Sequence, residues 1–145
     1  MKIIFLSILL FSFILSCGNL TKTQSSSNQL DIKTDKTYYA ISDSIKIILE
    51  NSTEFEILLR LRCKTYLEIS YQKKNLDSWS DNLDFWYMSL GCLTSIDTLK
   101  PNSIYSYSMK SGIFDSTGMY RLVLDYYNPV EKTNGIKYSN AFEIR

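Results

Sequence analysis

From residue 30 onward, apolar and polar side chains alternate with a period of two, and this alternation limits the possible folds more than any other feature. Ile45, Ile47 and Leu49, for example, share one face of residues 44–50. A period of two is typical of β-strands with one buried face, whereas an amphipathic helix repeats every 3.6 residues. The pattern predicts strands at residues 30–34, 44–50, 55–62, 65–71, 84–88, 103–109, 119–126 and 136–144.

Short polar segments separate several of these strands and carry residues that favour turns. The predicted turns are Asn51-Ser52-Thr53, Lys100-Pro101-Asn102, Ser116-Thr117-Gly118 and Thr133-Asn134-Gly135. About seven short strands within residues 30–145 is the spacing of a β-sandwich. We therefore expect an all-β fold, an antiparallel sandwich of about seven strands, with a small Greek-key barrel as the alternative.

The composition excludes several functions. The chain of 145 residues has 16 Lys and Arg against 15 Asp and Glu, a net charge of +1, so it has no basic surplus with which to bind nucleic acid. It contains no histidine, which excludes Ser-His-Asp and Cys-His catalysis and histidine-ligated zinc. Nucleotide-binding and acyl-enzyme motifs are also absent from the sequence. We expect neither an enzyme nor a cofactor.

The first residues have the pattern of an export signal. Lys2 precedes an apolar segment, residues 3–15, which is too short to span a bilayer and ends in Ile14-Leu15-Ser16-Cys17. This ending resembles the bacterial lipobox. The resemblance implies that residues 1–16 are a lipoprotein signal peptide and that Cys17 carries the lipid that anchors the mature protein to a membrane. The alternative is an ordinary signal peptide with a cysteine near its end.

The residues after Cys17 predict where the domain lies. Gly18, instead of aspartate, follows the cysteine, so we expect transfer to the outer membrane where the host has one. Residues 17–29 are almost entirely polar and are predicted to be a flexible tether. The folded domain is then residues 30–145.

The cysteine count is consistent with lipidation. Three cysteines would leave one unpaired thiol in an exported protein, but acylation of Cys17 leaves only Cys63 and Cys92. Because exported proteins fold in an oxidising compartment, we predict that these two form a disulfide. Two buried free thiols are the alternative.

A segment near the C-terminus narrows the architecture. Asp115, Gly118 and Tyr120 lie in the sequence D-S-T-G-M-Y-R-L, which resembles the tyrosine corner of immunoglobulin-like sandwiches. The resemblance implies that the Tyr120 hydroxyl bonds to backbone across the corner. Leu122 occupies the position where antibody domains have a cysteine, so a Cys63–Cys92 bridge would lie elsewhere. In the final strand we expect Phe142 and Ile144 to face the core.

The order of these features is similar to that in small immunoglobulin-like domains of uncharacterised bacterial lipoproteins. More distantly, it is similar to the bacterial intracellular proteinase-inhibitor domain, from which we carry over no inhibitory residues. The fold expected from these resemblances is an immunoglobulin-like β-sandwich.

Aromatic residues provide the candidate binding site. Trp79, Trp86 and Tyr87 could form one exposed platform that stacks on sugars or on apolar side chains of a partner. The alternative is that Phe85 and at least one tryptophan fill the core. Tyr105 and Tyr107 share one face of a predicted strand, which is either turned inward or open to partners.

Carboxylates in the same region provide a second candidate. Asp77, Asp81 and Asp84 offer oxygen ligands for calcium, but their loop lacks the alternate-residue ligands and the central glycine of an EF-hand. We expect no metal site there.

From these features we expect a lipid-anchored binding or accessory module of the cell envelope without catalytic activity, with a protein or glycan as partner. One alternative is an inhibitor or immunity-type lipoprotein that binds a single protein partner. Another is a carbohydrate-binding accessory protein.

Overall fold

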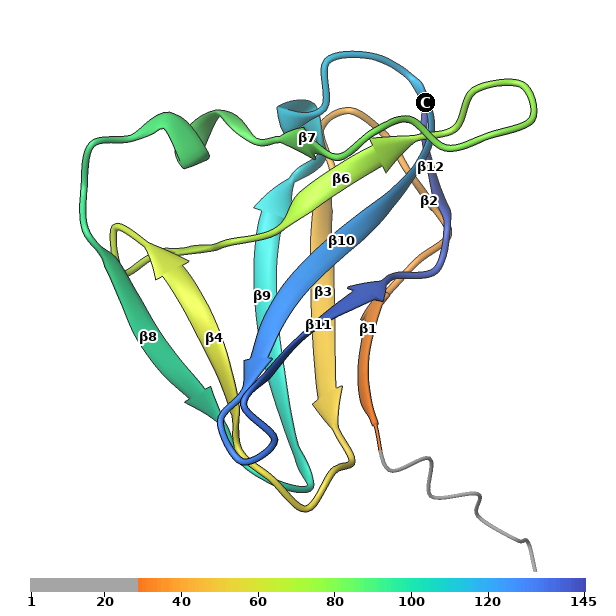
Figure 1. Cartoon of the computed structure of the whole chain (residues 1–145). Helices are drawn as coiled ribbons and strands as arrows, with labels where there is room; N and C mark the ends of the chain where they lie inside the picture. Colours follow the sequence, from red (N-terminus) through yellow and green to blue (C-terminus); the bar gives the residue numbers. More distant parts are fainter. Residues whose placement is uncertain (1–28) are drawn as a thin grey trace, which may run out of the picture.

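The computed structural model describes residues 29–145 and shows an all-β sandwich (Figure 1). The predictions of the signal peptide, the Cys17 lipid and most of the tether concern residues outside this range. One sheet has three strands in the order β1-β3-β9, formed by Leu30–Thr34, Ser44–Asn51 and Ser103–Lys110. The strands of this sheet are antiparallel throughout.

The second sheet is built around β10 (Gly118–Asn128), the longest strand. On one side β10 pairs with β11 (Thr133–Tyr138) and β12 (Phe142–Ile144), and on the other with β6 (Ser70–Lys73) and β4 (Ile57–Arg62). The remaining strands extend this sheet; they are β2 (Tyr38–Tyr39), β5 (Tyr66–Leu67), β7 (Leu83–Asp84) and β8 (Thr94–Leu99). All pairs are antiparallel except β2 with β12, which is parallel.

The strand order confirms the expected sandwich and excludes the barrel, because two separate sheets contribute to one core. In the first sheet β1, β3 and β9 alternate inward residues such as Ile32, Ile47 and Met109 with outward ones. The second sheet contributes Leu59 and Tyr120 among others. Phe142 and Ile144 are buried, as predicted for the final strand.

Residues 29–145 form twelve strands, because two predicted strands are divided and two further strands were not predicted. The predicted strand 65–71 is divided into β5 and β6, and the predicted strand 136–144 into β11 and β12. The predicted strand 84–88 is wrong: most of it forms a 3₁₀ turn, η1 (Trp86–Ser89). A second 3₁₀ turn, η2 (Ser111–Ile113), follows β9, and β2 and β8 were not predicted.

The turn predicted at Thr133-Asn134-Gly135 is also wrong, since these residues begin β11. Gly135 pairs with Tyr126, and the Tyr126 ring occupies the space that a Cβ at this glycine would need. The glycine therefore makes room for a ring across the sheet. The chain reverses at residues 129–132, where Lys132 has a φ of 54°.

Candidate functional site: an aromatic groove between the sheets

A groove of about 650 Å³ opens where the edge of the three-stranded sheet meets the second sheet. One wall is formed by Tyr66, Trp86 and Tyr87 and the other by residues 107–110 of β9. Gly112 and Ile113 of η2 complete the lining. We call this feature, defined by these residues, the aromatic groove.

Trp86 is the exposed residue of the first wall, with 56% of its surface accessible. Its ring lies edge-on to the rings of Tyr66 and Tyr87, at centroid distances of 5.6 and 6.0 Å. Tyr66 also stacks on Tyr87 at 4.9 Å. The wall is therefore a contiguous set of aromatic rings with one member open to solvent.

Tyr87 is fully buried and contacts the Trp86 ring from the core side. Its hydroxyl donates a hydrogen bond of 2.9 Å to the Leu67 carbonyl, and its ring stacks on Phe85 at 5.5 Å. Phe85 is extended and buried, so successive residues at the start of η1 point alternately inward and outward. The 3₁₀ turn presents Trp86 while its two neighbours remain in the core.

The segment that carries Trp86 is fixed at further points. The Arg62 guanidinium donates hydrogen bonds to the Leu90 carbonyl and to the Thr94 hydroxyl. The predicted disulfide is present: Cys63, in the turn after β4, is bonded to Cys92, just before β8, with a Cα–Cα distance of 5.2 Å. A residue held in this way loses little conformational entropy when it binds a partner.

The second wall comes from β9. Tyr107 and Met109 point toward the core side of the three-stranded sheet, and Tyr105 and Tyr107 are half-buried against the core. Of the two interpretations of this strand, the one in which Tyr105 and Tyr107 face inward is correct. Burial raises the pKa of the Tyr107 phenol and of the Tyr87 phenol above the ordinary value of 10.0. Both groups are therefore neutral hydrogen-bonding groups near pH 7.

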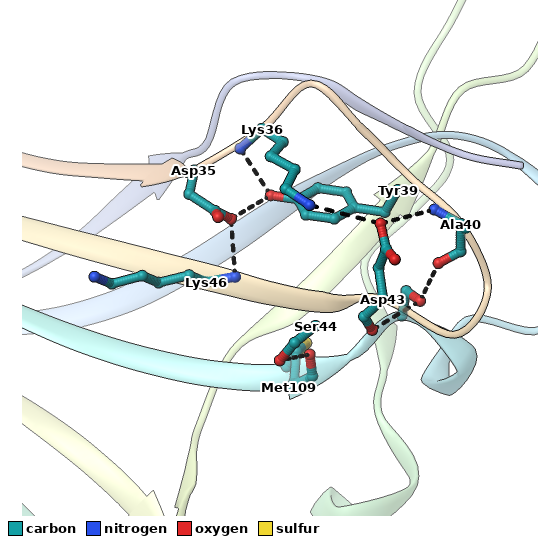
Figure 2. Close-up of polar contacts among 9 residues, drawn as sticks. Asp35, Lys36, Tyr39, Ala40, Asp43, Ser44, Lys46 and Met109 are labelled. Atoms are coloured by element: carbon teal, nitrogen blue, oxygen red, sulfur yellow. Dashed lines mark hydrogen bonds and ion pairs between the residues drawn. The ribbon is translucent and has the colours of Figure 1, made fainter.

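Polar contacts hold the end of the groove at η2, and Figure 2 shows those among Lys36, Ala40 and Asp43. The Ser111 hydroxyl donates to the Ala40 carbonyl at 2.6 Å, and the Ser111 amide donates to the Asp43 carbonyl at 3.0 Å. The Asp43 carboxylate in turn accepts the Ala40 amide at 3.2 Å and pairs with the Lys36 ammonium at 3.7 Å. This network joins the β2–β3 turn to the end of β9.

Asp35 belongs to the same network. Its carboxylate accepts the Tyr39 hydroxyl at 2.7 Å and the Lys46 amide at 3.0 Å. Burial by itself would raise the pKa of Asp35, but these hydrogen bonds outweigh it and the pKa is lowered from 3.8. Burial and the bond to Asp35 raise the pKa of Tyr39 to about 12.

The three aromatic residues proposed for one platform are separated in the structure. Trp86 and Tyr87 belong to the aromatic groove, whereas Trp79 lies over Arg121 of β10, 4.5 Å from its guanidinium carbon. The same guanidinium carbon lies 4.1 Å from the centre of the Tyr138 ring. A platform of all three residues is therefore not formed, because Trp79 packs on the outer face of the second sheet.

The remaining predicted residues are placed as follows. Asp77, Asp81 and Asp84 are exposed, and within residues 29–145 no group of three or more acidic, cysteine or histidine side chains is arranged to hold a metal ion. The Tyr120 hydroxyl donates to the Ser116 carbonyl at 2.7 Å, as the tyrosine corner implies. Gly118 has a φ of 142°, and Asp115 accepts the Tyr71 hydroxyl at 3.5 Å.

Sequence reasoning did not identify Tyr66 or η2 as parts of the site. Tyr66 lies in a segment that was predicted only to form a strand. It contacts Trp86 because the hairpin of β4 and β5 returns beside η1. The one available signal was the density of aromatic residues in three separate segments. No helix within the described range is long and apolar enough to cross a membrane.

Comparisons with known proteins identify no family. No protein-family model matches the sequence, and no curated protein matches it. Among solved structures, the chain is similar to Spo0M, a sporulation control protein from Bacillus subtilis, with 9% identity and a TM-score of 0.44. The similarity covers 81% of this chain and 49% of that protein, so the chain spans about half its length. Similarity at this level supports no inference about function.

Proposed function

We propose that this protein is a lipid-anchored binding module of the cell envelope that acts without catalysis, and that the aromatic groove is its binding site. The observation that carries the proposal is an exposed tryptophan held rigidly at the mouth of a groove of about 650 Å³. Grooves of this size with mostly aromatic and aliphatic walls are typical ligand sites. Tryptophan and tyrosine also dominate the binding energy of many protein interfaces.

The ionisable groups of the groove are suited to binding. Its tyrosines Tyr87 and Tyr107 have raised pKa values and stay protonated, and Lys110 supplies one positive charge at the β9 wall. Neutral phenols and one ammonium can orient a ligand by hydrogen bonds and charge. They lack the pair of acid and base groups poised near neutral pH that general acid–base catalysis requires.

The position of the groove agrees with an anchor at Cys17. Leu30 pairs with Asn51, which pairs with Ser103, so the chain enters the domain level with the first residue of β9, with β3 between them. The groove uses residues 107–110 at the other end of β9. At about 3.4 Å per residue, the two points are separated by about 20 Å along the strand. The groove therefore lies away from the point where the tether joins the domain, which leaves it free to face away from the lipid.

The test uses the tagged, lipidated protein isolated from its own envelope. We expect one dominant protein to co-isolate with wild type, to be lost with Trp86→Ala and to be retained with the matched control Trp79→Ala. This result would also favour the inhibitor or immunity-type function. Equal co-isolation with Trp86→Ala and wild type would contradict the assignment of the groove.

The carbohydrate-binding alternative is supported by the same exposed ring, since tryptophan faces stack on sugars. The Trp79→Phe variant leaves Trp86 as the single tryptophan of the chain. Under this alternative, envelope polysaccharide fragments would change the fluorescence of that variant in a saturable way.

A further inference from the structure

Strand β9 forms an edge of the three-stranded sheet. It pairs with β3 along all eight residues, from Ser103 opposite Asn51 to Lys110 opposite Ser44. No described strand pairs with its other side, as the order β1-β3-β9 shows (Figure 1). In an antiparallel ladder, alternate residues direct their N–H and C=O groups to opposite sides. Half of the β9 backbone therefore offers hydrogen bonds away from β3.

β9 lacks the features that usually protect an edge strand, which are short length, central charges, proline and bulges. Its register with β3 is continuous, it contains no proline, and its charged residue is the last one, Lys110. The other edge of the sheet, β1, has Asp31 and Lys33 within five residues. Strand β8, which borders the second sheet, has Asp97 near its centre.

The outward residues of β9 also leave its backbone accessible. Ser106 and Ser108 are small and exposed, and Ile104 is an apolar residue with 64% of its surface accessible. An added strand would find little steric hindrance and one apolar contact on this face. These are the properties of a surface that accepts a strand.

The topology shows why the position beside β9 is open. In constant-type immunoglobulin domains a fourth strand completes the corresponding sheet. Here the segment between β7 and β9 forms β8, which pairs with β4 of the second sheet. Among the described residues, none supplies the fourth strand next to β9.

The aromatic groove lies along this edge. Residues 107–110 of β9 form one of its walls, and Trp86 and Tyr66 lie opposite. Successive side chains of a strand point to opposite faces. A strand added to β9 would therefore direct alternate side chains into the groove, where aromatic rings and Ile113 would surround them.

The charges near this end specify the partner further. Lys46 lies directly across from Ser108 on the outer face, and Lys110 lies two residues beyond Ser108. Both lysines are exposed, and neither takes part in the ion pairs found among residues 29–145. Two unpaired ammonium groups favour a partner with a carboxylate at this end of the strand.

We propose that the partner is an extended segment of another protein that adds to β9 as a fourth strand. It would place alternate apolar or aromatic side chains in the aromatic groove and an acidic residue near Lys46 and Lys110. This inference rests on the proposed function and specifies its ligand class. Main-chain hydrogen bonds to β9 would supply affinity, and the groove and the lysines would supply specificity.

The test selects a display library of random ten-residue peptides on the full, lipidated protein. We expect the enriched peptides to alternate apolar with polar residues and to carry Asp or Glu near one end. Hydrogen exchange of the β9 amides should slow when such a peptide binds. Methylation of alternate peptide nitrogens, which removes donors but keeps the side chains, should weaken binding at least about tenfold.

Variants of the protein test the side-chain contacts. Trp86→Ala and Lys110→Glu should each weaken peptide binding, whereas the matched changes Trp79→Ala and Lys74→Glu should not. Replacing the acidic residue of the peptide by lysine should restore binding to Lys110→Glu. Rescue of this kind separates a direct charge contact from a loss of folding.

The outcomes distinguish the two proposals. Strand addition would be overturned if the methylated peptide bound as tightly as the unmethylated one and the β9 amides were not protected from hydrogen exchange. The groove would then remain as a binding site. If no peptide is enriched and an oligosaccharide binds and quenches the fluorescence of Trp86, strand addition is likewise overturned and the groove remains a binding site. If neither peptides nor glycans bind and Trp86→Ala leaves co-isolation unchanged, both proposals fail.

Discussion

Tyr120 closes the corner that precedes the long central strand. Its hydroxyl donates to the Ser116 carbonyl at 2.7 Å, and its ring contacts Phe114 at a centroid distance of 4.6 Å. The buried ring contributes to the core, and the hydroxyl fixes the turn to the strand. Gly118, between them, has a left-handed φ that a side chain would disfavour.

Replacement of this tyrosine by phenylalanine tests the corner. We expect Tyr120→Phe to lower the free energy of unfolding by about 1 kcal/mol, because the Ser116 carbonyl loses its donor while the ring is retained. Urea denaturation measures the change. The exposed Tyr138→Phe serves as the control, and equal stability of Tyr120→Phe and wild type would show that the corner bond contributes nothing.

The negative charge of Asp35 is stabilised by the hydrogen bonds that its carboxylate accepts from the Tyr39 hydroxyl and the Lys46 amide (Figure 2). Its pKa is lower in the folded protein than the ordinary value of 3.8. The stability that it contributes is therefore present above pH 3.8 and is lost as the pH falls through the folded pKa.

The pH dependence of an Asp35→Asn variant checks this assignment. We expect the variant to be less stable than wild type at neutral pH, and the difference to shrink as the pH falls below 3.8. Unfolding free energies measured across this pH range would show the trend, with exposed Asp77→Asn as the reference. A difference that does not depend on pH would mean that the negative charge is not what stabilises the network.

At the scale of elements, the segment from η1 to β8 is held at several points. The Tyr87 hydroxyl attaches η1 to β5, the Arg62 guanidinium donates to the Leu90 carbonyl, and the disulfide attaches Cys92 to the turn after β4. In that turn Cys63 and Lys64 have φ values of 53° and 63°, a conformation that disfavours side chains. The disulfide therefore constrains a turn that local preferences do not favour.

Removal of the disulfide should affect both stability and the groove. The closed loop between Cys63 and Cys92 predicts that Cys63→Ala with Cys92→Ala lowers the unfolding free energy by about 3.5 kcal/mol. Because the same segment carries Trp86, its fluorescence should also become more accessible to quenchers. Thermal unfolding and acrylamide quenching measure the two effects, and an unchanged intact mass after reduction of wild type would contradict the bond itself.

At the scale of the molecule, the two ends of β9 have different environments. One end lies level with Leu30 across β3, at the same end of the sheet where the chain enters the domain, and the other end borders the aromatic groove. A lipid on Cys17 would thus hold the protein by the end opposite its binding site. This arrangement suits the function proposed above, in which the groove meets a partner away from the membrane.

The anchor itself stays a prediction, since Cys17 lies outside the described residues. We expect Cys17→Ala to release the protein from the membrane fraction, because lipid chains supply the membrane affinity. Fractionation of cells that express each form measures the distribution, with Ser12→Ala as a control in the same segment. Membrane attachment that persists in Cys17→Ala would rule out the lipid anchor.

Much of the fold could be predicted from local pattern. The strands at residues 30–34, 44–50, 103–109 and 119–126 agree with β1, β3, β9 and β10 because alternation gives each a face that packs in the core. Val123 of β10 departs from the alternation and is buried on the other face. The corner at Tyr120 and the pair of Cys63 with Cys92 were also predicted. These features depend on residues close in sequence or on the chemistry of a few side chains.

The tertiary structure alone decided which strands became edges and which aromatic residues met. Trp86 and Tyr87 were predicted site residues, but their partners Tyr66 and Tyr107 come from other segments and from both sheets. Trp79, which has the same side chain as Trp86, packs on Arg121 instead. The alternation of apolar and polar residues along a strand predicts which face is buried. It does not predict which strand lies beside it, because pairing depends on contacts between residues far apart in sequence.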